Sequence, residues 1–345
     1  MIYSSGIGTF TRGVITNLPE KHEFILIGDV RKLRSFKRRG IRLYHCTIPP
    51  FSWKETLFNH KDLGADCLFL PNYSLLGFLH SKRFITVHDV LFQDMPRYCR
   101  NSAEGYLKRL YLKISCRFAK IIFTVSRFSK ERVHNVLGNR TVVIVPNGLM
   151  DTEEYKKSIV SISKDKNLLV FIGNLKAHKN LTVILDALLL MQDSNPQFHL
   201  AVVGKQSDMR TADDKTFKHP LFFRNPQSVC LVNELERQSL LELVASARYV
   251  IQPSLYEGFS IVPMEALACG TQPIISEIPV HREIYGSSPA KFFDPYNPKE
   301  LVEKILEEPV EIPSGFGKRY AEDHGYTYKN CAMLMINTME KICGT

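Results

Sequence analysis

The segment Pro253–Gly270 holds the residues best suited to chemistry. Two carboxylates, Glu257 and Glu265, lie on either side of the start of a helix expected over 261–269. The first N–H groups of a helix lack intrahelical partners, so this start favours an anion such as a diphosphate. Two carboxylates would repel that anion unless each accepts a hydrogen bond from a hydroxyl group. We interpret Glu257 as a partner of a sugar hydroxyl and Glu265 as a partner of a ribose hydroxyl.

The alternative is an ordinary amphipathic helix with two solvated glutamates. Pro263 fits a first helical turn and Gly270 fits a left-handed stop in either case. A second loop favours the functional interpretation. Residues 171–180, FIGNLKAHKN, leave an expected strand and enter a helix, and Gly173 permits a close turn there. Lys179 could place its ammonium over a diphosphate, although loop lysines such as this one are often only solvated.

The first half of the chain offers weaker candidates. Gly6 and Gly8 precede a helix expected over 9–18, where a Gly-x-Gly turn lets backbone amides approach phosphate. A third glycine and the usual preceding strand are missing, because only Met1–Ser4 come before this loop. His88 ends an expected strand over 84–87, so it is either a site residue or a packed histidine.

Short apolar runs that alternate with helical patterns predict βα units and parallel sheets. In the first half, we expect strands over 23–27, 67–70, 84–87, 121–124 and 142–145, and helices over 9–18, 103–118 and 128–137. After a polar linker over 150–167, we expect strands over 168–172, 199–203, 229–231, 249–251, 273–275 and 291–292. The helices expected there cover 181–191, 237–247, 261–269, 280–285 and 299–307.

These elements predict two facing, doubly wound α/β domains with a cleft between them. The predicted boundaries are 1–155 for an acceptor-side domain, 156–320 for a nucleotide-sugar domain, and 321–345 for a helix that packs back on the first domain. A length of 345 residues suits two hydrophobic cores.

The composition, 44% hydrophobic and 23% charged, is typical of a globular protein. No stretch resembles a signal peptide or a membrane span. The eight cysteines show no Cys-x-x-Cys pair, so we expect reduced core thiols rather than disulfides or a zinc site. A cytoplasmic location follows as an expectation.

Positive charge is concentrated in the first half. Residues 1–150 hold 24 Lys and Arg against 10 Asp and Glu, while the whole chain has a net charge of +10. In one cluster, Arg97–Lys120, basic residues alternate with apolar ones, as in a helix with one cationic and one apolar face. This predicts either contact with an anionic membrane, on the inner face of the cytoplasmic membrane, or a solvated basic face. No nucleic-acid module is recognisable, so nucleic acid is not expected as a partner.

Taken in order, several segments resemble family 4 of the retaining glycosyltransferases, which have the two-domain GT-B fold. They are SGIGTFTR, TVHDV, TVSRFSK, VPNG, GNLKAHKN, the Glu257–Glu265 pair as the family's Glu-x7-Glu motif, EIPVHREIYG and FDPYNPKEL. The resemblance covers nearly the whole chain and is most specific at the two glutamates.

The resemblance implies a role for each matching residue. It implies that His88, Lys179 and Glu257 are catalytic, with His88 against the transferred sugar and Lys179 on the diphosphate. The remaining implied donor-binding residues are Gly6, Gly8, Gly173, Asn174, Val232, Gly258, Phe259, Ser260 and Glu265. Many relatives have an arginine where this chain has Asn174, so charge stabilisation would depend more heavily on Lys179.

The implied reaction moves a sugar from a nucleoside diphosphate sugar to a glycan or lipid-linked acceptor in envelope polysaccharide or lipopolysaccharide synthesis, with retained configuration. GDP-mannose is the preferred donor, and a UDP-sugar is the alternative. Relatives need no divalent metal, and no Asp-x-Asp pair suggests one here, so neither a metal nor another cofactor is expected. A sugar-nucleotide epimerase, a dinucleotide-dependent oxidoreductase and a non-catalytic sugar-binding protein are the rival classes.

Overall fold

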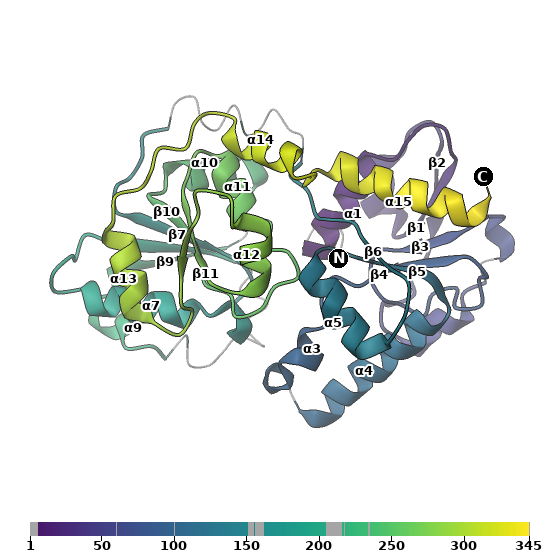
Figure 1. Cartoon of the computed structure of the whole chain (residues 1–345), viewed down its shortest axis with the longest axis horizontal. Coiled ribbons are helices and arrows are strands. Elements are labelled where there is room, and N and C mark those ends of the chain that lie inside the picture. The colour runs from purple at the N-terminus through teal and green to yellow at the C-terminus, as the bar shows by residue number, and fades with distance from the viewer. Residues whose placement is uncertain are drawn as a thin grey trace. The chain divides into compact units, whose positions relative to one another are not determined.

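The computed structural model describes residues 6–59, 61–99, 101–150, 155, 162–204, 216, 218–233 and 235–344. The chain divides into two compact units (Figure 1). Unit 1 comprises Met1–Met150 together with Gly325–Thr345, and unit 2 comprises Asp151–His324. Each unit is an α/β structure with parallel strands.

Unit 2 contains one six-stranded parallel sheet. Its strands are β7 (Leu168–Ile172), β8 (His199–Val203), β9 (Val229–Val232), β10 (Tyr249–Gln252), β11 (Pro273–Ser276) and β12 (Lys291–Phe293). All six were expected to within one residue at each end. The spatial order is β9-β8-β7-β10-β11-β12, so the chain winds outward from β7 on one side and from β10 on the other. A ligand site is expected outside the carboxyl ends of β7 and β10, where this order reverses.

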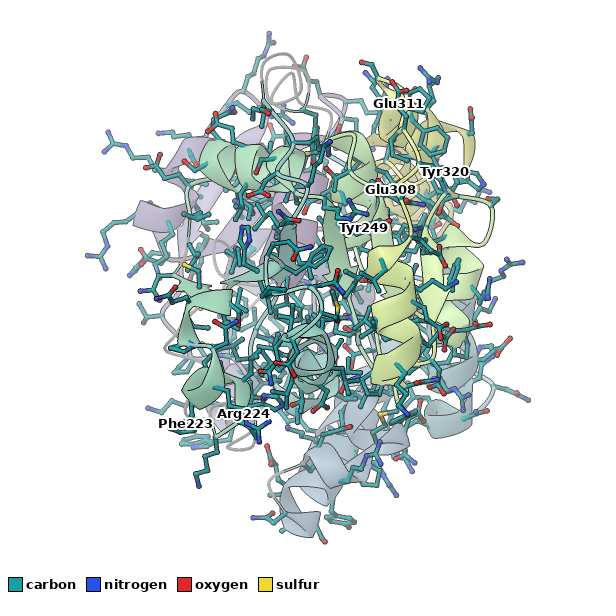
Figure 2. All side chains as sticks on the ribbon, turned by 90° about the vertical axis from the view of Figure 1, so that its left-hand side faces the viewer. Phe223, Arg224, Tyr249, Glu308, Glu311 and Tyr320 are labelled. Atoms are coloured by element: carbon teal, nitrogen blue, oxygen red, sulfur yellow. The ribbon has the colours of Figure 1, made fainter. Side chains whose placement is uncertain are left out.

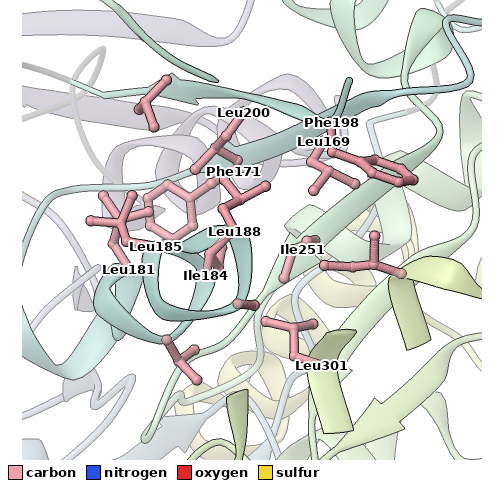
Figure 3. Packing of buried hydrophobic residues seen from close by; sticks show 14 of the residues in the cluster. Leu169, Phe171, Leu181, Ile184, Leu185, Leu188, Phe198, Leu200, Ile251 and Leu301 are labelled. Carbon is pink, nitrogen blue, oxygen red and sulfur yellow. The ribbon is translucent and has the colours of Figure 1, made fainter. Parts of the chain in front are cut away.

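Helices cover both faces of this sheet, which is why its strands are apolar throughout. On one face, α7 (Leu181–Met191) and α13 (Pro298–Leu306) pack on the sheet through Ile184, Leu188 and Leu301 (Figure 3). The helices α10 (Arg237–Ser246), α11 (Val262–Ala268) and α14 (Phe316–Asp323) contact one another or the other face. The remaining helices here are α9 (Leu221–Arg224) and α12 (Pro279–Tyr285).

Unit 1 has a four-stranded parallel sheet, ordered β3-β4-β5-β6. Neighbouring residues of its strands point to opposite faces: Ile85 packs with α4 (Ser102–Arg117) and α5 (Arg127–Leu137), whereas Phe84 packs with α1 (Gly6–Thr16) and α15 (Tyr328–Cys343). The strands are β3 (Leu68–Leu70), β4 (Arg83–Thr86), β5 (Ala119–Thr124) and β6 (Val142–Ile144).

Two expectations for unit 1 were wrong. A separate two-stranded parallel sheet pairs β1 (Phe24–Gly28) with β2 (Ile41–His45), and β2 was not predicted. In β2, Arg42 and His45 interrupt the apolar residues and only Ile41 is buried, so this strand lacks the apolar run that signals a core strand. In addition, α1 begins at Gly6, so Gly6 and Gly8 lie in its first turn and not in a loop before it. The expectation of a missing first strand concerns residues before Gly6, which lie outside the described ones.

Short helical segments connect these elements. They are α2 (Val30–Leu33), α3 (Leu91–Asp94), η1 (Arg34–Phe36), η2 (Trp53–Leu57), η3 (Lys61–Leu63), η4 (Pro96–Tyr98), η5 (Ala177–Lys179) and η7 (Pro226–Ser228). Throughout the described part of the chain, no helix is both long and apolar enough to cross a bilayer. The cysteines are free thiols, and Cys230 is exposed although core positions were expected for this residue type.

Candidate functional site

The loops after β7 and β10 meet at the reversal of strand order in unit 2. The Leu255 N–H donates to the His178 carbonyl at 2.8 Å. The Asn180 amide donates to the carbonyls of Pro253 at 3.2 Å and Pro295 at 2.8 Å. Asn180 has a φ of 56°, a left-handed conformation that asparagine tolerates better than most residues. These contacts hold the two loops in one fixed arrangement.

The loop after β7 also needs close backbone packing. The Gly173 N–H donates to the Val203 carbonyl at 3.0 Å. A Cβ on Gly204 would lie 2.3 Å from the Gly173 oxygen, which is too close for any side chain at this position. Gly173 itself forms a bend directly after β7, and it is Gly204 whose position leaves no room for a side chain.

Lys179 and Glu257 form an ion pair where these loops meet. The Lys179 Nζ lies 2.6 Å from Glu257 Oε1, and both side chains are mostly buried. The Ser254 hydroxyl donates to the same oxygen at 2.7 Å, and the Gln252 amide does so at 3.0 Å. Three donors therefore converge on Oε1. The sequence predicted Lys179 and Glu257 as site residues. It did not predict that Ser254 and Gln252 would donate hydrogen bonds to Glu257.

The ion pair determines the charge state of the carboxylate. Burial raises the pKa of Glu257, but the Lys179 charge and the hydrogen bonds from Lys179 and Ser254 outweigh burial and hold this pKa at about 2. Glu257 is ionised at neutral pH. An ionised carboxylate accepts hydrogen bonds only, which suits it to hold hydroxyl groups.

His281 is fully buried and lies close enough to Glu257 to interact with it electrostatically. Its Nδ1 lies 2.8 Å from the Ser276 carbonyl, which can only accept, so Nδ1 carries the proton. Its Nε2 is buried with no hydrogen-bond partner among the described residues. Burial lowers the pKa of His281 to about 4, and burial together with the Lys179 charge lowers that of His178 to about 4. Both imidazoles are neutral at pH 7.

These two histidines predict an acid-sensitive unit 2. A folded-state pKa of about 4, below the ordinary 6.5, means that the unfolded chain binds protons first as pH falls. The contribution of the two neutral histidines to the free energy of unfolding is therefore fully present above about pH 6.5. It is lost progressively down to about pH 4, by up to about 1.4 kcal/mol per pH unit for each histidine. Urea unfolding across this range should show the loss. His281→Asn should make the pH dependence shallower, and an unchanged slope would contradict this account.

The turn that follows Glu257 contains a left-handed residue. Ser260 has a φ of 68°, while the next residue, Ile261, is right-handed, and successive residues of opposite hand turn their N–H groups to one side. The Tyr285 hydroxyl donates to the Ser260 carbonyl and supports this strained residue. The Ser260 hydroxyl is buried with no partner among the described residues. Because α11 begins only at Val262, Gly258–Ser260 form this turn ahead of the helix and not its first turn.

Glu265 lies within α11 and has protein partners that the sequence did not indicate. Arg237 contacts Glu265 Oε1 at 2.7 Å, and the Tyr155 hydroxyl donates to the same oxygen at 3.4 Å. Arg237 also donates to the Tyr155 hydroxyl at 2.6 Å and lies over its ring. No spacing rule links these residues, because Arg237 and Tyr155 come from distant parts of the chain.

Two other predicted donor-binding residues, Asn174 and Val232, lie at different distances from β7 in unit 2. Asn174 follows Gly173, and its side-chain oxygen is buried with no partner in the described part of the chain. Val232 ends β9, which is separated from β7 by β8. The structure thus joins Lys179 to Glu257 directly and leaves Val232 two strands away from β7.

The remaining predicted residues belong to unit 1. His88 follows β4, its Nε2 lies 2.9 Å from the Pro71 carbonyl, and burial lowers its pKa, so it is a neutral imidazole that donates through Nε2. Gly6 and Gly8 lie in the first turn of α1. Ser126 accepts from the Ser129 N–H as the N-cap of α5.

Residues 151–308, all in unit 2, match the family model for glycosyl transferases group 1. This matched segment, just under half of the chain, is a glycosyl transferases group 1 domain. The chain is 27% identical over 212 residues to an O-antigen chain mannosyltransferase of Salmonella typhimurium, covering 58% of this chain and 53% of the relative. It is 26% identical over 204 residues to the GDP-mannose:cellobiosyl-diphosphopolyprenol alpha-mannosyltransferase of Xanthomonas campestris, covering 59% of this chain and 48% of the relative. The matches thus span about half the length of these two relatives.

The fold comparison extends over more of the chain. The structure resembles Anabaena HepE, solved in complex with UDP and glucose, with a TM-score of 0.72 and 14% identity, over 98% of this chain and 96% of that one. At this identity the likeness concerns the fold alone. Together with the two parallel-sheet units, it shows that this chain has a GT-B-like fold.

Proposed function

We propose that this enzyme transfers mannose from GDP-mannose to a glycan or lipid-linked acceptor in envelope polysaccharide synthesis. The observation that carries the proposal is the Lys179–Glu257 pair beside the turn Gly258–Ser260, at the reversal of strand order. A cation and the backbone amides of a turn suit a diphosphate, and an ionised carboxylate suits sugar hydroxyls. The mannosyltransferase relatives favour mannose over other sugars.

In the proposed reaction, the bond between the anomeric carbon and the diphosphate oxygen breaks while the acceptor oxygen bonds to the same face of the sugar. Lys179 and the turn amides stabilise the charge that develops on the leaving diphosphate, which is the main catalytic contribution. A diphosphate oxygen takes the proton of the acceptor hydroxyl. Glu257 holds the sugar hydroxyls, and Glu265 holds the ribose.

His88, Gly6 and Gly8 complete the proposal from unit 1. The neutral His88 imidazole would contact the transferred sugar, and the glycines would lie against the donor phosphates. In unit 2, Gly173 and Asn174 would line the diphosphate and Val232 the base. We further propose that the enzyme acts at the cytoplasmic membrane, where lipid-linked acceptors are found.

A UDP-sugar is the second candidate donor, since the fold is shared with a protein solved with UDP and glucose. A thermal-shift screen of GDP, UDP, GDP-mannose and UDP-glucose distinguishes the two, followed by product analysis with the best donor. We expect GDP-mannose to raise the melting temperature most and to give an α-linked mannoside. Stabilisation by UDP-sugars alone would shift the assignment to the second donor, and stabilisation by none of the four would refute the nucleotide site.

A further inference from the structure

Helix α4 exposes apolar side chains where a surface helix normally exposes polar ones. Leu112, Ser115 and Cys116 are its buried positions and define its inner face. At 100° per residue, the opposite face is centred on Leu107, Leu110 and Ile114, all of which are exposed, Leu107 to 61%. The sequence pattern predicted an apolar face, and the structure turns most of that face outward. Figure 1 shows α4 along the outside of unit 1.

Cations border this apolar face along one edge. Arg109, Lys113 and Arg117 recur every four residues beside it, and all three are exposed. Within the part of the chain that the structure describes, none of the three forms an ion pair, in contrast to Lys108, which pairs with Glu104 at 2.8 Å. These charges are therefore not needed to balance acids of unit 1.

The surface continues beyond the end of the helix. The rings of Phe118 and Phe78 contact each other with centroids 6.2 Å apart. Beside them, a hollow of about 630 Å³ is lined by apolar and basic side chains together, among them Leu79, Arg117, Phe118, Lys120 and Arg140. Leu79 is 72% exposed. An apolar stripe thus leads into a cationic hollow at the carboxyl end of α4.

The flank of α4 adds aromatic residues. The Phe51 and Tyr111 rings lie 5.7 Å apart, and the Tyr111 hydroxyl donates to Glu55 of η2. Trp53, also in η2, is 68% exposed and is the only tryptophan of the chain. Isolated exposed apolar residues are ordinary, as with Phe223 beside Arg224 on unit 2 (Figure 2). A continuous row of them is not.

We propose that α4 binds the surface of an anionic bilayer, with Leu107, Leu110 and Ile114 in the acyl boundary and Arg109, Lys113 and Arg117 among the headgroups. An interfacial helix binds through buried apolar area together with attraction to anionic lipid. The excess of 24 Lys and Arg over 10 Asp and Glu in residues 1–150 complements that charge. The purpose of this binding, access to a lipid-linked acceptor, rests on the proposed function, but the binding itself needs no donor.

Two other occupants fit this surface less well. A nucleic acid would engage the cations but would leave the central leucines in water. A second copy of the chain, packed face to face, would bring the unpaired cations of both copies together at a cost in repulsion. A bilayer satisfies both the apolar row and its cationic edge.

The test is sedimentation of the full chain with vesicles of phosphatidylcholine, with and without phosphatidylglycerol. Energy transfer from Trp53 to a dansyl lipid reports the same binding. The variant Leu107→Ser/Leu110→Ser/Ile114→Ser should lower the affinity for anionic vesicles by about 1,000-fold, because each of the three leucine-sized burials is worth about tenfold. Arg109→Gln/Lys113→Gln/Arg117→Gln should lower it by about 100-fold and remove the preference for phosphatidylglycerol. Both sets lie on the surface, so melting temperatures should change little.

Leu190→Ser provides the matched control, since Leu190 is an exposed leucine of α7 in unit 2. It should bind vesicles like the parent chain. Equal binding by all variants, or equal binding to uncharged vesicles, would overturn the proposal. So would a parent dimer in sedimentation velocity that the leucine variant converts to monomer, which would identify a second copy as the occupant. Vesicle binding with no transfer to any acceptor would instead count against the proposed function alone.

Discussion

Replacing Lys179 by methionine should lower kcat for sugar transfer by about 10²- to 10³-fold, the usual loss when one preorganised donor to a developing anion is removed. Methionine keeps most of the length of the side chain but lacks its charge. The loss should appear in kcat more than in KM, since the charge on the leaving diphosphate grows toward the transition state. Steady-state kinetics with a soluble acceptor analogue measures both quantities.

Lys176→Met is the matched control for this experiment. Lys176 lies in the same loop, but it is exposed and does not join the Lys179–Glu257 pair. Its variant should retain nearly full activity. If both methionine variants lost activity equally, the loop's overall charge and not the position of Lys179 would be responsible. If neither did, Lys179 would not be catalytic.

Glu257→Gln separates the catalytic role of the pair from its structural role. The single change leaves the mostly buried Lys179 ammonium without its partner, which destabilises unit 2 as well as removing the sugar contact. The double variant Lys179→Met/Glu257→Gln removes both charges and should recover melting temperature while staying inactive. Recovery of activity along with stability would show that the pair serves folding only.

Replacing Glu265 by glutamine should weaken nucleotide binding by about 10- to 100-fold. A hydrogen bond to a charged group is worth about 1.5–3 kcal/mol, and each 1.4 kcal/mol is a factor of ten in Kd. Calorimetry with GDP and UDP measures this loss. Glu242→Gln, a change at an exposed glutamate of α10, is the control and should leave Kd unchanged.

A 2′,3′-dideoxynucleotide shows whether the ribose is the group that Glu265 holds. It should bind the parent enzyme more weakly than the normal nucleotide, yet bind the parent and Glu265→Gln alike. Arg237 contacts Glu265 in the structure, so Arg237→Gln should also reduce affinity by releasing the carboxylate from its position. Equal losses for the normal and dideoxy ligands would contradict a ribose contact.

The order of elements in unit 2 was predictable because it depends on local patterns. Buried parallel strands appear in the sequence as short apolar runs, and the helices that cover them appear as apolar residues at helical spacing. Every strand from β7 to β12 could therefore be identified. The split sheet of unit 1 was not predictable to the same degree. Arg42 and His45 break up the apolar residues of β2, so no continuous apolar run signals it, and glycines at Gly6 and Gly8 obscured the true start of α1.

The residue types at the site were readable from the chain alone: a lysine, two glutamates and a glycine turn, in the order and spacing that predict a group 1 glycosyltransferase. Which of these residues touch one another follows from the three-dimensional fold. It joined Lys179 to Glu257 with Ser254 and Gln252 on one oxygen, and it placed Arg237 on Glu265. The spacing of residues along the sequence indicates local conformation. Contacts between loops depend instead on the order of the strands in the sheet. The outward apolar face of α4 is likewise decided by which side of the helix meets the core.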